Sequence, residues 1–362
     1  MLNTKIIDEM IKKGLEERIF PGAAISIGNK SGELFRKIYG FRQIFPQKHP
    51  MESDTLFDIA SLTKIFTSIV ALKLIQDGSL SLSDTLGKFF DAPSDKAKIT
   101  IAHLMTHTSG LPAHEHVYNL VKEPSETFDF ILSMKLLDEP GKAVVYSCLG
   151  YILLGRICEI LGGNTIENLA KRWIFEPLGL ESTAYNPEKN HTFAVTELDT
   201  VTNTWLDGVV HDENARFLKG ISGNAGIFAN IDDMATFAMM LANKGTFGDK
   251  VIIEQNLFEE AIKNLTAHCP EGRGLGFEIK SNTLISCGNV FSVGSYGHTG
   301  FTGTSLWVDI ETGLYVVFMS NRVHPTRENV KHIPFRRELH DLCATEYKKV
   351  YRRQSALLSS TT

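Results

Sequence analysis

Ser61 and Lys64 stand three residues apart at the start of a long apolar segment. Residues with this spacing lie on one face of a helix, so the hydroxyl and the amine are expected within hydrogen-bond reach. Burial and the positive end of the helix dipole both favour a neutral lysine, which can accept the serine proton. The same helix start offers N–H groups to an oxyanion. The pair indicates a nucleophilic serine, and the alternative is a capping serine with a surface lysine.

Two further motifs carry polar side chains that suit a cleft. Tyr146 precedes Ser147 and Cys148 at a helix start, and a tyrosine near the serine can relay protons when cations lower its pKa. The alternative is a core tyrosine. The third motif runs from His298 through Thr299 to Gly300, where the glycine allows a substrate to approach a strand edge, and a plain turn is the alternative.

Other catalytic signatures are missing from the sequence. It contains no G-x-S-x-G, H-E-x-x-H, G-x-x-x-x-G-K-[ST] or strand-linked G-x-G-x-x-G. Their absence argues against the α/β-hydrolase, zincin, P-loop and Rossmann classes.

The amino-acid composition is typical of an ordinary globular protein. The chain has 362 residues, 43% hydrophobic and 22% charged, with a formal net charge of −5, which argues against nucleic acid as a partner. No apolar run reaches the ~18 residues of a membrane span, and the first residues resemble no signal peptide. We therefore expect a cytoplasmic protein. Its five scattered cysteines are expected to be free thiols.

The apolar patterns predict the elements that must position these motifs. Residues 3–18 form an amphipathic helix, 23–28 and 33–39 a hairpin, and 61–76 a helix buried all round. Further helices are expected at 99–107, 125–137, 148–161, 165–176, 231–243, 254–264 and 330–351. Strands are expected at 274–280, 284–291, 304–309 and 313–319.

These elements predict an α+β fold in which strands from both chain ends form one antiparallel sheet, flanked by the terminal helices. The sheet domain is discontinuous and comprises residues 1–78 and 217–352. Residues 79–216 form a mainly helical inserted domain, and 353–362 a flexible tail.

The three motifs, in this order and at these separations, resemble the serine β-lactamase and penicillin-binding superfamily. The similarity is greatest to its class C-like branch, which includes class C β-lactamases, DD-carboxypeptidases, D-aminopeptidases and esterases. Residues 57–64 resemble the family's nucleophile segment, and residues 99–112, 140–155 and 176–180 resemble other family segments. The resemblance spans about residues 5–345 and implies the β-lactamase/transpeptidase-like fold.

The resemblance also implies roles for individual residues. Ser61 would be the acylated nucleophile, and Lys64 and Tyr146 would share general-base and general-acid work. His298 lies where the family's third motif has Lys or His, and the N–H groups of Ser61 and Phe301 would form the oxyanion hole. Neither a metal nor another cofactor is implied.

Substrate contacts are expected from Cys148, Asn224, Thr299, Gly300 and Phe301. Cys148 departs from the family pattern, because many relatives have Asn there to contact a substrate amide, and a thiol replaces an amide poorly. His298 in place of Lys resembles the peptidase and esterase branches and weakens the anchoring of a substrate carboxylate. Asn224 has a structural turn as its equal alternative.

For other groups of polar residues we weigh a functional role against a structural one. His103 and His107 have the spacing of zinc ligands, but no H-E-x-x-H completes them and the family signature already explains the segment. Residues 211–215 are expected near the cleft. Arg322 and His324 either border the cleft or, as we favour, support loop structure.

We therefore predict a serine hydrolase that acts through an acyl-Ser61 intermediate on a small ester or amide, with esterase activity favoured. The alternatives are a D-amino-acid peptidase or DD-carboxypeptidase, a β-lactamase, and a non-catalytic binding protein on the same fold. The partner is a small-molecule ester, amide or β-lactam-like substrate, with neither nucleic acid nor membrane. The oligomeric state stays open.

Overall fold

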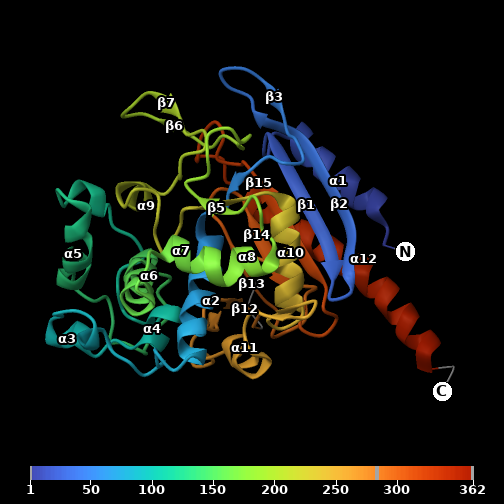
Figure 1. Cartoon of the computed structure of the whole chain (residues 1–362). Coiled ribbons are helices and arrows are strands. Elements are labelled where there is room, and N and C mark those ends of the chain that lie inside the picture. The colour runs from blue at the N-terminus through green and yellow to red at the C-terminus, as the bar shows by residue number, and fades with distance from the viewer. Residues whose placement is uncertain (1, 282–284, 360–362) are drawn as a thin grey trace.

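The computed structural model describes residues 2–281 and 285–359, with side chains as far as residue 352. Its centre is an eight-stranded antiparallel sheet in the order β11-β12-β13-β14-β15-β1-β2-β3 (Figure 1). The strands are β1 (Gly22–Asn29), β2 (Gly32–Gln43), β3 (His49–Pro50), β11 (Gly272–Arg273), β12 (Glu278–Ile279), β13 (Tyr296–Thr299), β14 (Ser305–Val308) and β15 (Tyr315–Ser320).

The two ends of the chain meet in the middle of this sheet. β1 pairs with β15 antiparallel, in a register that runs from Ala23 opposite Ser320 to Gly28 opposite Tyr315. Both strands are buried on both faces except at Asn29, which explains their continuous apolar sequences. The predicted α+β class and the single antiparallel sheet from both chain ends are confirmed.

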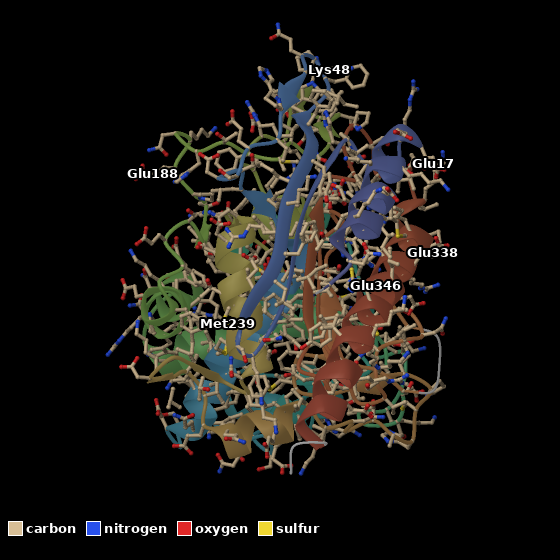
Figure 2. The ribbon with its side chains drawn as sticks, turned by 90° about the vertical axis from the view of Figure 1, so that its right-hand side faces the viewer. Glu17, Lys48, Glu188, Met239, Glu338 and Glu346 are labelled. Atoms are coloured by element: carbon tan, nitrogen blue, oxygen red, sulfur yellow. The ribbon has the colours of Figure 1, made fainter. Side chains whose placement is uncertain are left out.

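Helices cover both faces of the sheet (Figure 2). On one face lie α1 (Thr4–Glu16) and α12 (His332–Ser359), whose Ile7 and Phe335 join a core with Ile25 and Phe318 of the sheet. On the other face, α10 (Ile231–Ala242) packs against β1, β14 and β15. The sheet is thus the middle layer of three.

α2 (Thr63–Gln76) lies between the sheet and the helical region. Its residues from Thr63 to Leu72 are all buried, as predicted from its apolar circumference, and Phe66 stacks on Phe237 of α10 with ring centroids 3.9 Å apart. α2 also packs against α6 (Cys148–Gly162) and α7 (Ile166–Ala170). The start of α2 therefore lies at the junction of the two regions.

The remaining elements are short. The helices are α3 (Ser94–Ala97), α4 (Ile101–Met105), α5 (Thr127–Ser133), α8 (Glu176–Leu178), α9 (Glu213–Phe217) and α11 (Gln255–Ala261). The strands of the small sheets are β4 (Phe57–Asp58), β5 (Ala184–Tyr185), β6 (Leu198–Asp199), β7 (Thr204–Trp205), β8 (Ile227–Ala229), β9 (Thr246–Phe247) and β10 (Lys250–Val251).

The structure corrects two strand predictions. Within the predicted strand 284–291, the described residues 285–291 contain only an isolated bridge between Ile285 and Gly288, and residue 284 lies outside the described part. Conversely, no strand was predicted at β13, which contains His298 and Thr299 of the third motif. Polar residues along β13 hid its strand character.

Other boundaries differ by a few residues. The predicted strand 274–280 is reduced to β12, and α12 continues into the predicted tail as far as Ser359, while residues 360–362 lie outside the described part. The division into a sheet domain and an inserted helical domain stays an interpretation. Among the described helices, none combines the length and apolar character that crossing a bilayer requires.

Candidate active site

Ser61 lies in a short 3₁₀ helix, residues Ala60–Leu62, that joins β4 to α2. The Asp58 side chain fixes this turn by accepting hydrogen bonds from the N–H groups of Ala60, at 2.8 Å, and His211, at 2.7 Å. Ala60 itself has a φ of 48°, a conformation that non-glycine residues adopt only with strain. The surrounding structure therefore holds Ser61 in a defined position at a strained turn.

Lys64 is fully buried, and its ammonium has three partners. Its Nζ donates to Ser61 Oγ at 2.9 Å, to the carbonyl oxygen of Asn224 at 2.9 Å and to Cys148 Sγ at 3.5 Å. The predicted contact between the serine and lysine side chains is present. An ammonium has three donors, so this arrangement uses each of them.

The charge state of Lys64 corrects one prediction. Burial lowers its pKa, but the neighbouring side chains of Cys148, Tyr146 and Asp212 raise the pKa above its ordinary value. The raised pKa favours an ammonium in the free site, in contrast to the neutral Lys64 that the sequence predicted. The sequence showed the burial of Lys64 but not the polar groups that surround it.

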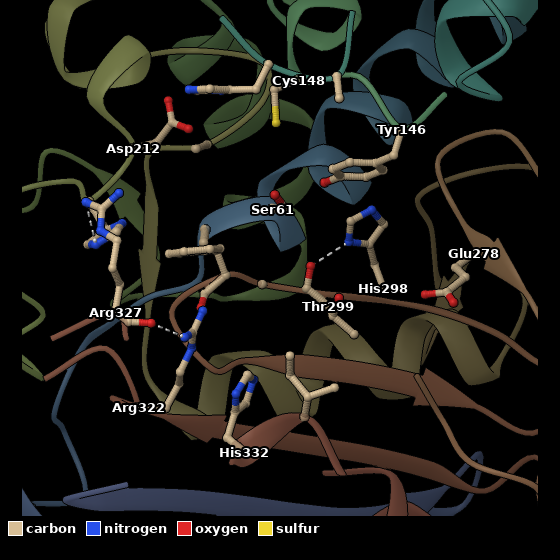
Figure 3. A pocket seen from close by; sticks show the side chains of 18 of the residues that line it. Ser61, Tyr146, Cys148, Asp212, Glu278, His298, Thr299, Arg322, Arg327 and His332 are labelled. Carbon is tan, nitrogen blue, oxygen red and sulfur yellow. Dashed lines mark hydrogen bonds between the residues drawn. The ribbon is translucent and has the colours of Figure 1, made fainter. Parts of the chain in front are cut away.

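Tyr146 lies beside the serine–lysine pair. The Lys64 ammonium is 5.1 Å from the centre of its ring, and Figure 3 shows its hydroxyl turned toward Ser61. Burial raises the pKa of the Tyr146 phenol, and Lys64 offsets this only in part. Tyr146 is therefore a neutral phenol in the free site, and it can pass a proton only together with Lys64.

His298 lies behind Tyr146, with ring centroids 5.7 Å apart. Burial, together with Lys64 and Arg273, lowers the pKa of His298 to about 3, so its ring is neutral. Nδ1 lies 2.8 Å from the carbonyl oxygen of Thr299 and must donate to it, which leaves Nε2 as a hydrogen-bond acceptor. This ring cannot supply a positive charge to a substrate carboxylate.

The loop after β13 packs against the nucleophile segment, where Thr304 Oγ1 donates to the carbonyl oxygen of Ile59 at 3.0 Å. The Phe301 N–H makes no hydrogen bond with the residues that the structure describes, and the Ser61 N–H lies in the first turn of its helix, where such groups lack intrahelical partners. A Cβ at Gly300 would lie 2.1 Å from Thr304 Oγ1 and 2.5 Å from the carbonyl oxygen of Ile59. Gly300 therefore permits close packing of the loop against the nucleophile segment.

Most predicted site residues line one pocket of about 680 Å³. The pocket contains Ser61, Tyr146, Cys148, His298, Thr299, Gly300 and Phe301 (Figure 3). Lys64 lies beneath it. Asn224 is not among the lining residues: it is fully buried, and its side chain accepts from Ser222 Oγ at 2.7 Å while its carbonyl oxygen holds Lys64. Its side-chain Nδ2 has no hydrogen-bond partner among the described residues, and a substrate contact by Asn224 stays a prediction. The roles of the other residues stay predictions.

Sequence reasoning missed several charged residues of the pocket. They are Arg273, Glu278, Arg327, His332 and Arg336. Arg322 lines the pocket as one of our two interpretations allowed, and its guanidinium lies 4.5 Å from the Phe301 ring centre and donates to the Phe301 carbonyl oxygen. His324 instead accepts from the N–H of Ile44, at 2.9 Å, and thus supports loop structure.

The histidines at zinc-ligand spacing have other contacts. His103 Nδ1 accepts from the Thr100 N–H at 3.2 Å at the start of α4, and His107 Nδ1 accepts from the Ser147 N–H at 3.0 Å. Within residues 2–281 and 285–359, no group of three His, Cys, Asp or Glu side chains is arranged to hold a metal ion. All five cysteines are free.

The fold and the serine–lysine–tyrosine cluster define a serine hydrolase of the penicillin-recognising type. The family model "Beta-lactamase" matches residues 7–341, so the chain belongs to the Beta-lactamase family. It is a serine hydrolase of this family, in the class C-like branch of penicillin-binding proteins and esterases. The recognised resemblance is confirmed.

Two curated relatives and one solved structure illustrate the range of the family. A protein of Escherichia coli (strain K12) named "Putative D-alanyl-D-alanine carboxypeptidase" is 30% identical over 347 residues, which cover 84% of this chain and 79% of that protein. An N-acetylmuramyl-L-alanine amidase of Bacillus subtilis (strain 168) is 31% identical over an alignment 362 residues long, which covers 88% of this chain and 80% of that protein. The structure of EstCE1, a hydrolase with promiscuous acyltransferase activity, covers 94% of this chain and 98% of its own at 20% identity, with a TM-score of 0.77.

Proposed function

We propose that this protein hydrolyses small esters through an acyl-Ser61 intermediate. The observation that carries the proposal is the Ser61–Lys64 hydrogen bond of 2.9 Å at a strained turn, below an open pocket. Formation of a serine alkoxide needs an adjacent group that takes the proton, and Lys64 Nζ, with Tyr146 beside it, lies within hydrogen-bond reach of Ser61 Oγ.

The proposed reaction has two steps. In the reactive form the Lys64–Tyr146 pair has lost one proton, so the neutral amine accepts the Ser61 proton while Oγ attacks the ester carbonyl. The N–H groups of Ser61 and Phe301 bind the oxyanion, and the alcohol leaves with the proton. Water then attacks the acyl-serine with the same pair as base, which restores Ser61 and releases the acid.

Cys148 favours an ester over an amide or a β-lactam. Its thiol contacts Lys64 and lines the pocket at the position where an asparagine could both donate to and accept from a substrate amide. An ester also demands less protonation of its leaving group than an amide does. A D-amino-acid peptidase is the second candidate, because one curated relative is named as a putative D-alanyl-D-alanine carboxypeptidase. The cytoplasmic location stays a prediction from the sequence.

Intact-protein mass spectrometry after brief exposure to acyl donors tests the proposal. The donors are a p-nitrophenyl ester, a cephalosporin and a fluorophosphonate. Wild type and Ser61→Ala are compared, with Ser53→Ala, an exposed serine in the preceding loop, as the matched control. We expect adducts on wild type and Ser53→Ala only, and faster turnover of the ester than of the cephalosporin.

Each other outcome has a definite meaning. An equal adduct on Ser61→Ala would show that the nucleophile is a different residue. Faster turnover of the cephalosporin, or of a D-alanyl-D-alanine peptide added as a fourth substrate, would replace the esterase by the corresponding alternative. A folded wild-type protein that no donor labels would support the non-catalytic binding protein.

A further inference from the structure

Arg273 of β11 places a guanidinium over the ring of Tyr146. Its Cζ lies 5.5 Å from the centre of that ring, a distance typical of a cation–π contact. The side chain lines the pocket, although the residue is only 8% exposed. A guanidinium does not lose its proton in a protein, so this positive charge is present over the whole physiological pH range.

The backbone around β11 fixes Arg273 in this position. Arg273 lies opposite Glu278 of β12 in the antiparallel register, and its N–H donates to Thr266 Oγ1 at 2.8 Å. Its carbonyl oxygen accepts from the Leu265 N–H at 2.8 Å. The guanidinium forms an ion pair with Glu271 at 3.1 Å, while Nε is buried without a hydrogen-bond partner among the described residues. Because the Glu271 side chain is 60% exposed, water screens this pair and neutralises the charge of Arg273 only in part.

Several titratable side chains surround the Lys64–Tyr146 pair. They are His107, Cys148, Tyr151, Asp212, Arg273, Glu278 and His298. The ring centroids of His107 and His298 lie 4.5 Å and 5.7 Å from that of Tyr146, and burial lowers the pKa of both imidazoles, so they are neutral. Burial also raises the pKa of the thiol and of the second phenol in this set. Arg273 is therefore the one cation of the set.

The charge of Arg273 acts on the proton affinity of the groups around it. A fixed cation disfavours a proton on a neighbouring group, because a bound proton adds positive charge. Arg273 accordingly contributes to the low pKa values of both imidazoles and offsets part of the rise in the pKa of Tyr151. The Lys64–Tyr146 pair lies beside the same guanidinium, and it must lose one proton before it can accept the proton of the nucleophile.

We propose that Arg273 is a positioning residue for the reaction at Ser61, because its permanent charge favours loss of a proton from the Lys64–Tyr146 pair. This inference rests on the proposed function and adds a residue on which the reaction depends. His298 is neutral and supplies no such charge. The carboxylate of Glu271 weakens the effect of Arg273, so its removal should strengthen that effect.

Charge variants of Arg273 test the proposal, with kcat and KM measured on p-nitrophenyl acetate at pH 7. This neutral ester has no charged group that Arg273 could bind. For Arg273→Met we expect kcat to fall about tenfold, because a fixed charge at this range changes the proton affinity of a neighbouring group by about that factor. KM should change less than about threefold. Arg273→Lys restores the charge and should recover most of the loss in kcat.

Glu271→Gln should change kcat in the opposite direction. It removes the negative charge that partly neutralises Arg273, so we expect kcat to rise about twofold, an effect kept small by the exposure of Glu271. A purely structural ion pair would instead give a loss in both variants. Arg156→Met is the matched control and should retain the wild-type kcat. Arg156 also pairs with a glutamate at 3.1 Å and lies 5.6 Å from an aromatic ring centre, but it lies outside the pocket.

Three results would overturn the proposal: a kcat of Arg273→Met within twofold of wild type, an equal loss in Arg273→Lys, or a rise in KM with kcat unchanged, which would assign Arg273 to substrate binding. Arg273→Gln replaces the Met variant if that one does not fold. The rate at which the fluorophosphonate labels Ser61 should rank the variants in the same order. If wild type is labelled in this order but cleaves no ester, only the esterase proposal fails, and a protein that no donor labels would overturn both.

Discussion

The pocket has two walls, and the buried cation of each differs in the number of its hydrogen-bond partners. On the serine wall, formed by Ser61, Lys64, Tyr146 and Cys148, the Lys64 ammonium has three partners within the protein. The opposite side of the pocket is lined by His332 and Arg336 of α12, and we call these two residues the α12 wall. There the Arg336 guanidinium has no hydrogen-bond partner among the described residues, although both cations are buried. The partners of Lys64 preorganise a reaction, whereas Arg336 keeps the cost of its lost hydration.

Removal of the Lys64 amine should cause the largest loss of activity. For Lys64→Met we expect kcat/KM on a neutral p-nitrophenyl ester to fall about a thousandfold or more, because the Lys64 amine takes the Ser61 proton in the proposed reaction. Lys73→Met, in the last turn of the same helix, is the matched control and should retain full activity. A loss below about tenfold for Lys64→Met would assign the base to another residue.

The pH dependence of the reaction should reflect the loss of a proton from Lys64 on the serine wall and no other titration. The pKa of Lys64 is raised, so its amine is protonated at neutral pH, and the reactive form, which has lost that proton, gains population as the pH rises. We expect kcat/KM on a neutral ester to increase by up to about tenfold per unit from pH 7 to 9. His298 has a pKa of about 3 and should add no inflection near pH 6.5.

A flat profile over this range, after subtraction of uncatalysed hydrolysis, would contradict the protonated Lys64. An inflection near pH 6.5 that is lost in His298→Asn would contradict the neutral histidine.

Cys148 of the serine wall should influence which class of substrate is cleaved. For Cys148→Asn we expect cephalosporin turnover to rise about tenfold, because the amide can donate to and accept from the substrate while a thiol does so weakly. Steady-state absorbance assays measure this, with Cys269→Asn as a control outside the pocket. An unchanged rate would show that Cys148 does not limit recognition of β-lactams.

The free energy of unfolding should show the smallest effects, and it tests directly whether the cation of each wall has partners. Arg336→Met removes an uncompensated buried charge, so we expect the free energy of unfolding to rise by about 1 kcal/mol without ligand. Lys64→Met leaves the Asn224 carbonyl oxygen without its donor, so we expect a fall of about 1 kcal/mol. Urea denaturation measures both, and shifts of equal sign would remove the distinction between the walls.

The sequence predicted the serine wall better than the α12 wall. Ser61 and Lys64 lie within one helix, where spacing fixes their proximity, and Tyr146 and His298 were placed through their motifs. Arg336 had no such signal, because an arginine near the start of a terminal helix is ordinarily a solvated residue. Asn224 was predicted as a substrate contact or, equally, a structural turn, and the structure adds that its carbonyl oxygen accepts from Lys64.

The sequence by itself determined the family, the α+β class, the buried α2 helix and the contact between Ser61 and Lys64, because periodicity and local motifs encode these features over short stretches of chain. Only the tertiary structure decided the charge of Lys64, the tautomer of His298, the close packing at Gly300 and the lack of partners for Arg336. Each of these depends on which distant segments surround a side chain. Burial and the choice of hydrogen-bond partner are properties of that assembled environment.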